Sequence, residues 1–326
     1  MEEFHHNFSN MPKSKADEKI CPKVKVALID DGVALDRENI PVKGGTSFYQ
    51  STQSDPAFRQ YFVAPGGHGT TMAAFICLVC PDVELYAVRL NDSEHHTGGR
   101  KFTVKSCAEV KDIYQFGLFY RLTNFQALEW AIDTCQADII SMSWSFKEES
   151  HQKEREYIEK FRNLAIRAKG EGKILFCSLP DAAPIEDYKK YLPVSLDGVI
   201  RIGSATSLGR LSERNSDDSI EFALPGEMVR SEEERKFVTG SSVATAVAAG
   251  FAALIIYCVD LAEGMGLEIG RSPRNPDAIR AAFKEMIQDS QPKYPNPASA
   301  FKRPFPVDDA KVSKAELTRI VHRLGF

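Results

Sequence analysis

The sequence lacks several features that would place it in a specialised class. Residues 1–20 are polar and mixed in charge, without the apolar core of a secretory signal. The seven cysteines are an odd number and lie mostly in apolar segments, which argues against a disulfide framework. The net charge is only -4, which gives no electrostatic reason to expect nucleic acid as a partner. These absences favour an intracellular (cytoplasmic) protein that does not bind nucleic acid.

Two apolar features are open to a structural and a functional interpretation. Cys77 and Cys80 form a C-x-x-C motif, but no second pair accompanies them as a zinc site would require. They are therefore predicted to be small buried hydrophobic residues. Residues 243–259 carry no charge over about one bilayer-spanning length. A wholly buried helix explains this run as well as a membrane helix does, and we expect no membrane partner.

The remaining composition is that of a globular protein, with 43% hydrophobic and 26% charged residues in 326. Short β-branched runs alternate with segments of helical periodicity. Strands are expected at residues 24–30, 83–90, 138–143, 174–178 and 199–204, and helices at 68–80, from 124, at 157–170, from 242 and from 276. This alternation predicts an α/β fold with a mostly parallel central sheet flanked by helices on both faces.

Three short motifs carry residues with the chemistry of nucleophilic catalysis. Asp30 lies in IDDG at the end of a predicted strand, His68 lies in GGHGTTMAA, and Ser242 lies in TGSSVATAVAAG, where a helix is expected to begin. A hydroxyl is a poor nucleophile near neutral pH, so it needs a base within hydrogen-bond reach, and that base needs an orienting group. Each motif alone has an ordinary explanation as a turn, a structural histidine or a helix cap.

Taken together and in this order, the motifs resemble those of the subtilisin-like serine proteases, the subtilases. Leu224-Pro225-Gly226 is similar to the Pro-Gly segment that precedes the family's serine motif, and the likeness covers roughly residues 24–286. The resemblance implies a serine endopeptidase with a polypeptide substrate, in which Ser242 is the nucleophile, His68 the base and Asp30 the group that orients the base. It selects Asp30 over Asp31 and Ser242 over Ser241.

The resemblance also implies a division of the chain. Residues 1–23 are expected to be an N-terminal extension, residues 24–288 the subtilisin-like catalytic domain, and residues 289–326 a Pro-rich C-terminal extension with a short helix. That helix is expected to dock on the body, with partner binding as the alternative. A partner domain or a larger architecture stays open.

One position departs from the family in a way that bears on activity. Asp181 stands where the family usually places an Asn that donates a side-chain N–H to the oxyanion. An ionised carboxylate only accepts hydrogen bonds, and losing such a donor costs about 100–1,000-fold in turnover. Asp181 could donate if protonated, a backbone N–H could suffice in a slow enzyme, or the domain could be a catalytically impaired peptide-binding or regulatory module. A minority branch of the proprotein convertases also carries Asp here.

Expected substrate contacts follow from the family pattern alone. The first substrate pocket would be lined by Ser143, Trp144 and Ser145, and the facing edge strand would contain Gly117, Leu118 and Phe119. An extended peptide would then pair with backbone on both sides.

The segments SWSFKEE and IDDG also resemble those of kexin-like convertases, whose acidic groups select basic side chains. Glu148 and Asp31 are therefore candidates for Lys or Arg recognition, although Glu148 would equally suit the solvated start of the following helix. No cofactor is expected. Calcium stays possible but unsupported, because residues 91–99 show no spacing of metal ligands.

Overall fold

The computed structural model describes residues 23–37, 39–49, 56–90, 123–147, 152–180, 185–213, 219–301 and 310–326. At its centre is a seven-stranded sheet with the order β2-β3-β1-β4-β6-β8-β9, in which all neighbouring strands are parallel. The strands are β1 (Lys25–Asp30), β2 (Val42–Ser47), β3 (Glu84–Arg89), β4 (Ile139–Met142), β6 (Ile174–Ser178), β8 (Ile200–Ala205) and β9 (Phe222–Pro225).

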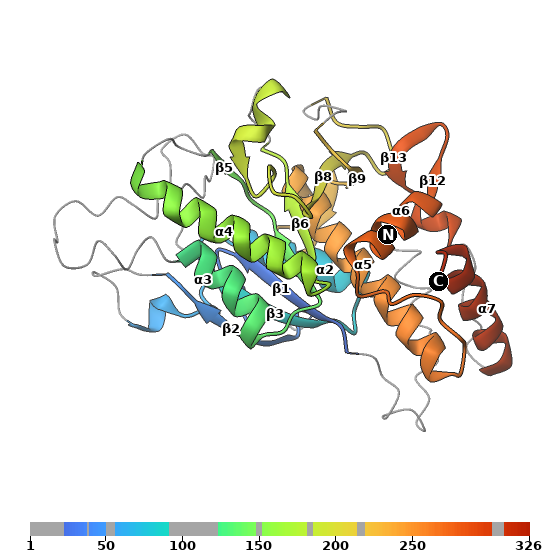
Figure 1. Ribbon diagram of the computed structural model, residues 1–326. Coiled ribbons are helices and arrows are strands. Elements are labelled where there is room, and N and C mark those ends of the chain that lie inside the picture. The colour runs from blue at the N-terminus through green and yellow to red at the C-terminus, as the bar shows by residue number, and fades with distance from the viewer. Residues whose placement is uncertain are drawn as a thin grey trace.

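Helices cover both faces of this sheet (Figure 1). One face packs against α2 (His68–Val79) and α5 (Ser241–Gly264), and the other against α3 (Thr123–Glu129), the π-helical turn η3 (Trp130–Thr134) and α4 (Gln152–Gly170). Successive side chains of β1 point to opposite faces, so Val26 and Leu28 join the first core and Ala27 and Ile29 the second. The arrangement confirms the α/β fold with a parallel sheet.

Smaller elements complete the described chain. They are the 3-10 turns η1 (Pro56–Arg59), η4 (Ile185–Lys190) and η5 (Pro297–Ser299), the helices α6 (Pro276–Glu285) and α7 (Ala310–Arg323), and the strand pairs β5 (Phe146–Lys147) with β7 (Tyr191–Leu192), β10 (Val229–Ser231) with β11 (Lys236–Val238), and β12 (Ile287–Gln288) with β13 (Gln291–Pro295). Asn275 caps α6, because its side-chain oxygen accepts the backbone N–H of Asp277 at 2.8 Å.

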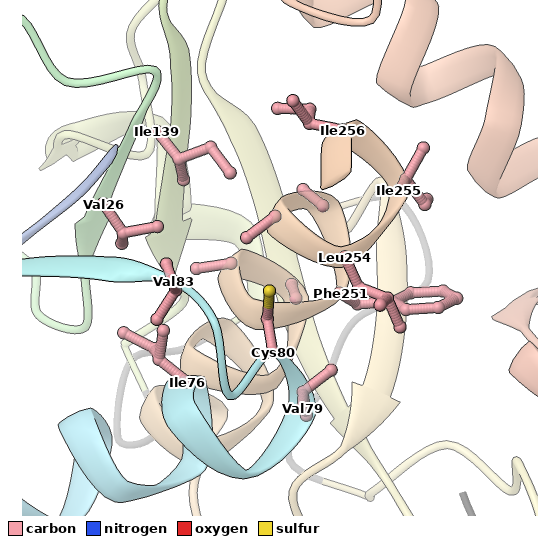
Figure 2. Packing of buried hydrophobic residues seen from close by; sticks show 14 of the residues in the cluster. Val26, Ile76, Val79, Cys80, Val83, Ile139, Phe251, Leu254, Ile255 and Ile256 are labelled. Carbon is pink, nitrogen blue, oxygen red and sulfur yellow. The ribbon is translucent and has the colours of Figure 1, made fainter. Parts of the chain in front are cut away.

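Helix α5 is the centre of the larger core. Among the described residues, it is the one helix long and apolar enough to cross a membrane by length and composition, and 94% of its apolar stretch is buried inside the protein. Figure 2 shows α5 residues such as Leu254 beside Ile76 and Cys80, with Val26 and Ile139 from the sheet in the same cluster. The uncharged run is therefore explained by burial on all sides.

Helices α2 and α5 approach each other closely at Gly250. A Cβ atom at this position would lie 2.8 Å from the carbonyl oxygen of Ile76 and 2.9 Å from the Cβ of Val79. Only glycine fits without moving one helix away from the other. His68 begins α2 and Ser242 lies in the first turn of α5. The spacing of the two helices at Gly250 therefore helps to set the positions of both residues relative to each other.

The C-terminal part of the chain docks on the body, as expected. Leu317, Ile320 and Val321 of α7, and Leu324 just after it, are buried in the same cluster as α5, while Tyr294 of β13 is buried in the other cluster. The expected boundary at residue 288 is therefore crossed by both cores.

The described cysteines behave as buried hydrophobic residues. Cys77, Cys80, Cys135, Cys177 and Cys258 are free and buried, and burial raises the pKa of Cys77 to about 12. This confirms the interpretation of the C-x-x-C motif as part of the core.

Candidate active site

The three central strands end at one edge of the sheet. Strands β1, β4 and β6 are parallel neighbours, so Asp30 at the end of β1, Ser143 after β4 and Leu179 after β6 lie on the same side. The chain lays β3 and β2 on one side of β1 and β4 on the other. Such a reversal of strand order is where ligands bind in open parallel sheets.

Asp30 and His68 are in direct contact. The Nδ1 atom of His68 lies 2.8 Å from Oδ1 of Asp30, which is buried, while 27% of the His68 side chain is exposed. An ionised carboxylate only accepts, so the proton of this bond is on Nδ1. The other ring nitrogen, Nε2, then carries the lone pair that a general base needs.

Asp31 contacts the backbone of α2 instead of the imidazole. Its carboxylate accepts the backbone N–H of Gly69 at 2.6 Å and that of His68 at 3.3 Å, and the side chain is buried. It therefore caps the start of α2 from outside the helix. The geometry agrees with the choice of Asp30 as the partner of His68, and a basic substrate side chain would have to compete with the helix for Asp31.

Gly32 brings the loop after Asp30 against the segment that precedes His68. Its φ is +106°, and a Cβ here would lie 2.4 Å from the carbonyl oxygen of Val63. The next residue, Val33, donates its N–H to the carbonyl of Tyr61 at 2.9 Å. The Asp-Asp-Gly motif thus needs its glycine for both the backbone conformation and the close contact.

Ser242 lies in the first turn of α5, which is fastened to the sheet edge. The hydroxyl of Ser241 donates to the carbonyl of Leu179 at 2.6 Å, and that of Ser143 donates to the carbonyl of Ser242 at 3.2 Å. Ser241 is buried and its hydroxyl is engaged, whereas Ser242 is half-buried. Of the two adjacent hydroxyl residues, Ser242 is therefore the more exposed.

The start of α5 also offers donors for a negative charge. The first N–H groups of a helix have no partner within the helix, and the positive end of the helix dipole lies there. The backbone N–H of Gly240 donates to the carbonyl of Gly226 at 2.8 Å, so the Pro-Gly segment holds the turn that leads into Ser242. A carbonyl oxygen that gains negative charge at this point would be stabilised.

The side chain of Trp144 points into the second core. Its side chain is buried in the second core, its Nε1–H donates to the carbonyl of Ile29 at 2.7 Å, and its ring lies 6.5 Å from that of Phe161. The side chain thus ties the end of β4 to the end of β1, and a contribution to a substrate pocket would come from its backbone. Ser143 is buried and Ser145 is half-buried.

Several predicted site residues lie outside the described residues. They are Gly117, Leu118, Phe119, Glu148 and Asp181. Their roles as substrate strand, basic-residue selector and oxyanion neighbour stay predictions. Among the residues that the structure describes, no group of three or more His, Cys, Asp and Glu could hold a metal ion.

Sequence reasoning missed an acidic turn beside the site, formed by residues 232–234 between β10 and β11. Glu233 pairs with Arg37 at 3.0 Å and accepts from Asn39 at 3.1 Å. Glu234 accepts the hydroxyl of Thr71 on α2 at 3.1 Å. The three consecutive glutamates were a visible signal, but a charge run usually belongs to a solvated loop.

The sequence of this chain matches one known protein family. A family model described as the Subtilase family matches residues 22–263, about three quarters of the chain. No curated protein sequence matches.

Solved structures with the same fold are distant in sequence. The crystal structure of a lanthipeptide protease is 19% identical, with a TM-score of 0.58 over 82% of this chain and 80% of that one. A cold adapted subtilisin-like serine proteinase is 18% identical, with a TM-score of 0.54 over 82% and 83%. The epidermin leader peptide processing serine protease EpiP from Staphylococcus aureus is 16% identical, with a TM-score of 0.59 over 90% and 78%.

Proposed function

Since the chain belongs to the subtilase family of serine endopeptidases, we propose that it cleaves peptide bonds through Asp30, His68 and Ser242. The observation that carries this assignment is the 2.8 Å contact between Nδ1 of His68 and Oδ1 of the buried Asp30. It leaves a partly exposed imidazole with Nε2 as its basic nitrogen, at the sheet edge to which the start of α5 is fastened.

The proposed reaction has two halves. Nε2 of His68 takes the proton of the Ser242 hydroxyl while Oγ forms a bond to the peptide carbonyl carbon. The carbonyl oxygen becomes negative and is stabilised by N–H groups at the start of α5. The C–N bond then breaks, the amine leaves with the proton from His68, and the acyl group stays on Ser242. Water repeats the sequence, which releases the carboxylic acid and restores the serine.

Asp181 belongs to the proposal as the residue next to the developing oxyanion. A protonated carboxyl there would donate an O–H, whereas an ionised one would leave the backbone N–H groups as donors. The second possibility is supported by the position of Ser242 at the start of α5, where the N–H groups and the helix dipole favour a negative charge.

A preference for basic side chains and an intracellular setting are finer parts of the proposal. The basic preference rests on Glu148, because the oxygens of Asp31 already accept from α2. Support for the intracellular setting comes from the free cysteines among the described residues, since free thiols persist in reducing compartments.

Labelling with a fluorophosphonate probe tests the assignment of the nucleophile. We expect the purified protein and the Ser241→Ala variant to be labelled, and Ser242→Ala not to be. Ser241 serves as the matched control, because it is the adjacent hydroxyl in the same helical turn. A folded wild-type protein that stays unlabelled at every pH would contradict the triad and favour a peptide-binding module, and loss of labelling in Ser241→Ala alone would reverse the assignment.

A panel of fluorogenic peptides tests the specificity. The peptides differ only at the cleaved residue, with Arg, its uncharged analogue citrulline, Lys and Gln. We expect Arg to be cleaved faster than citrulline and Glu148→Gln to reduce that ratio. Equal rates for Arg and citrulline would remove the basic preference and leave the proposed triad untouched.

A further inference from the structure

The hairpin of β10 and β11 connects the three segments that carry the proposed triad. It leads directly into the turn before Ser242, and its acidic turn contacts the other two segments. Glu233 pairs with Arg37, which follows Asp30 in the chain, and Glu234 accepts the hydroxyl of Thr71 at 3.1 Å. Thr71 lies three residues after His68 on α2 and therefore on the same face of that helix.

Glu234 is held at this position by further contacts. Its backbone N–H donates to Oγ of Ser231 at 3.1 Å, and its Oε2 pairs with Nζ of Lys236 at 2.7 Å. The Glu234 side chain is 35% exposed and that of Lys236 is 65% exposed. The carboxylate is therefore the more enclosed partner of the pair.

The charge state of Glu234 supports an interaction with the imidazole. Burial alone would raise its pKa, but hydrogen bonds from Lys236 and Thr71, together with the positive charges of Lys236 and His68, hold the pKa below its usual value. Glu234 is thus ionised at neutral pH. Electrostatic coupling acts equally on both partners, so a carboxylate that responds to protonated His68 also favours that protonated form.

We propose that Glu234 is a positioning residue for His68, whose carboxylate favours the protonated imidazole that forms during peptide-bond cleavage, while Lys236 opposes this effect. The catalytic meaning of the inference rests on the proposed function, in which His68 is the base. The electrostatic effect on the ring does not depend on that function.

Among the described residues, two further carboxylates contact His68 or its helix start. Asp30 at the end of β1 binds Nδ1, and Asp31 accepts the backbone N–H of His68 and of Gly69. The first turns of α2 and α5 contain no acidic residue. Glu234 contacts α2 from the hairpin through Thr71, and Lys236 pairs with Glu234 and carries the opposite charge. Neutralising Glu234 should make the imidazole lose its proton at lower pH, whereas neutralising Lys236 should have the reverse effect.

The test is an NMR titration of the His68 ring in the full chain. Histidine labelled with carbon-13 at Cε1 gives one signal per ring, and the His68 signal is identified by its loss in His68→Gln. We expect the midpoint to fall by about half a pH unit in Glu234→Gln and to rise by about 0.3 in Lys236→Gln. Both shifts should shrink in high salt, because both groups are partly exposed.

Glu232→Gln is the matched control. Glu232 lies in the same acidic turn, but it is 71% exposed and pairs with Arg230 at 2.8 Å. The same change of charge should move the His68 midpoint by less than about 0.1 pH unit. An equal shift in Glu232→Gln, no shift in Glu234→Gln, or shifts of the same sign in Glu234→Gln and Lys236→Gln would each overturn the inference.

This experiment separates the inference from the proposed function. The titration requires no turnover. If the NMR midpoints shift as expected but the fluorophosphonate probe does not label the protein, only the proposed triad is contradicted. In a labelled enzyme, the acid limb of the kcat/KM profile should move with the NMR midpoint. If the enzyme is labelled but the His68 midpoint is unchanged in Glu234→Gln, only the role of Glu234 is contradicted.

Discussion

Asp30 and Asp31 are neighbours in the chain, but they contact different parts of His68. Asp30 binds the ring and Asp31 accepts the backbone N–H groups of His68 and Gly69. One acid therefore orients the imidazole while the other fixes the start of the helix that carries it. Both carboxylates are buried, which limits the competition from water for the same donors.

We expect Asp31→Asn to lower the free energy of unfolding by about 1–3 kcal/mol, since an amide presents N–H to one of two backbone donors and leaves it without an acceptor. Urea unfolding measures the change. Asp36→Asn is the control, because Asp36 lies in the same loop with 73% of its side chain exposed, and it should cost less than about 0.5 kcal/mol. Equal losses in the two variants would contradict the capping role of Asp31.

We expect Asp181→Asn to preserve or raise activity at neutral pH. An Asn side chain donates an N–H to the oxyanion whatever the pH, and a gain of up to about 100-fold in kcat is in reach if the carboxylate is ionised in the native protein. The measurement is kcat/KM for a fluorogenic peptide at pH 7. A large loss would mean that Asp181 does not stand beside the oxyanion, or that its O–H is the better donor.

At the scale of helices and strands, the sequence pattern predicts best those strands that are buried on both faces of the sheet. Strands β1, β3, β4, β6 and β8 lie within the sheet, so their residues form apolar runs that are visible without the fold. Strand β2 pairs on one side only and contains Gly44 and Gly45, which have low strand propensity. The strand conformation of β2 depends on its pairing with β3, so no local sequence pattern predicts it.

The same reasoning explains which site residues could be found in advance. Asp30, His68 and Ser242 stand in motifs that are recognisable by their neighbours in the chain. The contact of Glu234 with Thr71 joins residues 163 positions apart, and the inward direction of the Trp144 indole depends on Ile29. Such contacts are set by how the elements pack, so spacing along the chain does not encode them.

We expect Gly250→Ala to destabilise the protein by about 1–3 kcal/mol, because the added methyl forces α2 and α5 apart. This cost outweighs the gain of about 1 kcal/mol in helix propensity. Thermal unfolding measures the stability, and kcat should fall because His68 and Ser242 are carried by these two helices.

Gly170→Ala provides the control for that substitution. Gly170 is the last residue of α4, and a Cβ there would meet nothing within 4 Å. Alanine at this position should be neutral or slightly stabilising. If Gly250→Ala were also neutral, the two helices would not be held at the distance that the structure shows.

At the scale of the whole molecule, Arg274 ties parts of the chain that are far apart. Its Nη1 and Nη2 donate to the two oxygens of Asp260 at 2.7 and 2.6 Å, and its Nε donates to Asp138 at 2.9 Å. Asp138 also accepts the backbone N–H of Lys25 at 2.9 Å. The guanidinium thus joins the end of α5 to the beginnings of β4 and β1.

We expect Arg274→Met to destabilise the protein by about 1–3 kcal/mol, because two partly buried carboxylates lose their partner. The effect is kept moderate by the 35% exposure of the arginine. Arg167→Met removes an exposed pair with Asp133 and should cost less than about 1 kcal/mol. Urea unfolding compares the two, and a difference smaller than the error would show that the Arg274 contacts contribute little.

The buried thiols yield a prediction for the native molecule as a whole. Burial raises the pKa of Cys77 and Cys258 to about 12, so at pH 8 almost none of either thiol is ionised. Since the thiolate is the reactive form, iodoacetamide should leave both unmodified in the folded protein and modify them in urea. Peptide mass spectrometry identifies each site, and rapid modification without urea would mean that the core opens.

The central position of α5 has a consequence for the cleavage of one copy of this protein by another. The ribosome makes the strand that ends in Asp30 long before the helix that begins at Ser241. A growing chain, or one truncated before residue 242, therefore lacks the Ser242 hydroxyl. Under the proposed triad, a copy whose core has loosened loses the alignment of Asp30, His68 and Ser242, and at the same time it exposes backbone that a protease can cleave. The proposed function therefore predicts that intact copies cleave unfolded copies faster than folded ones, so that a stored preparation loses its misfolded fraction first.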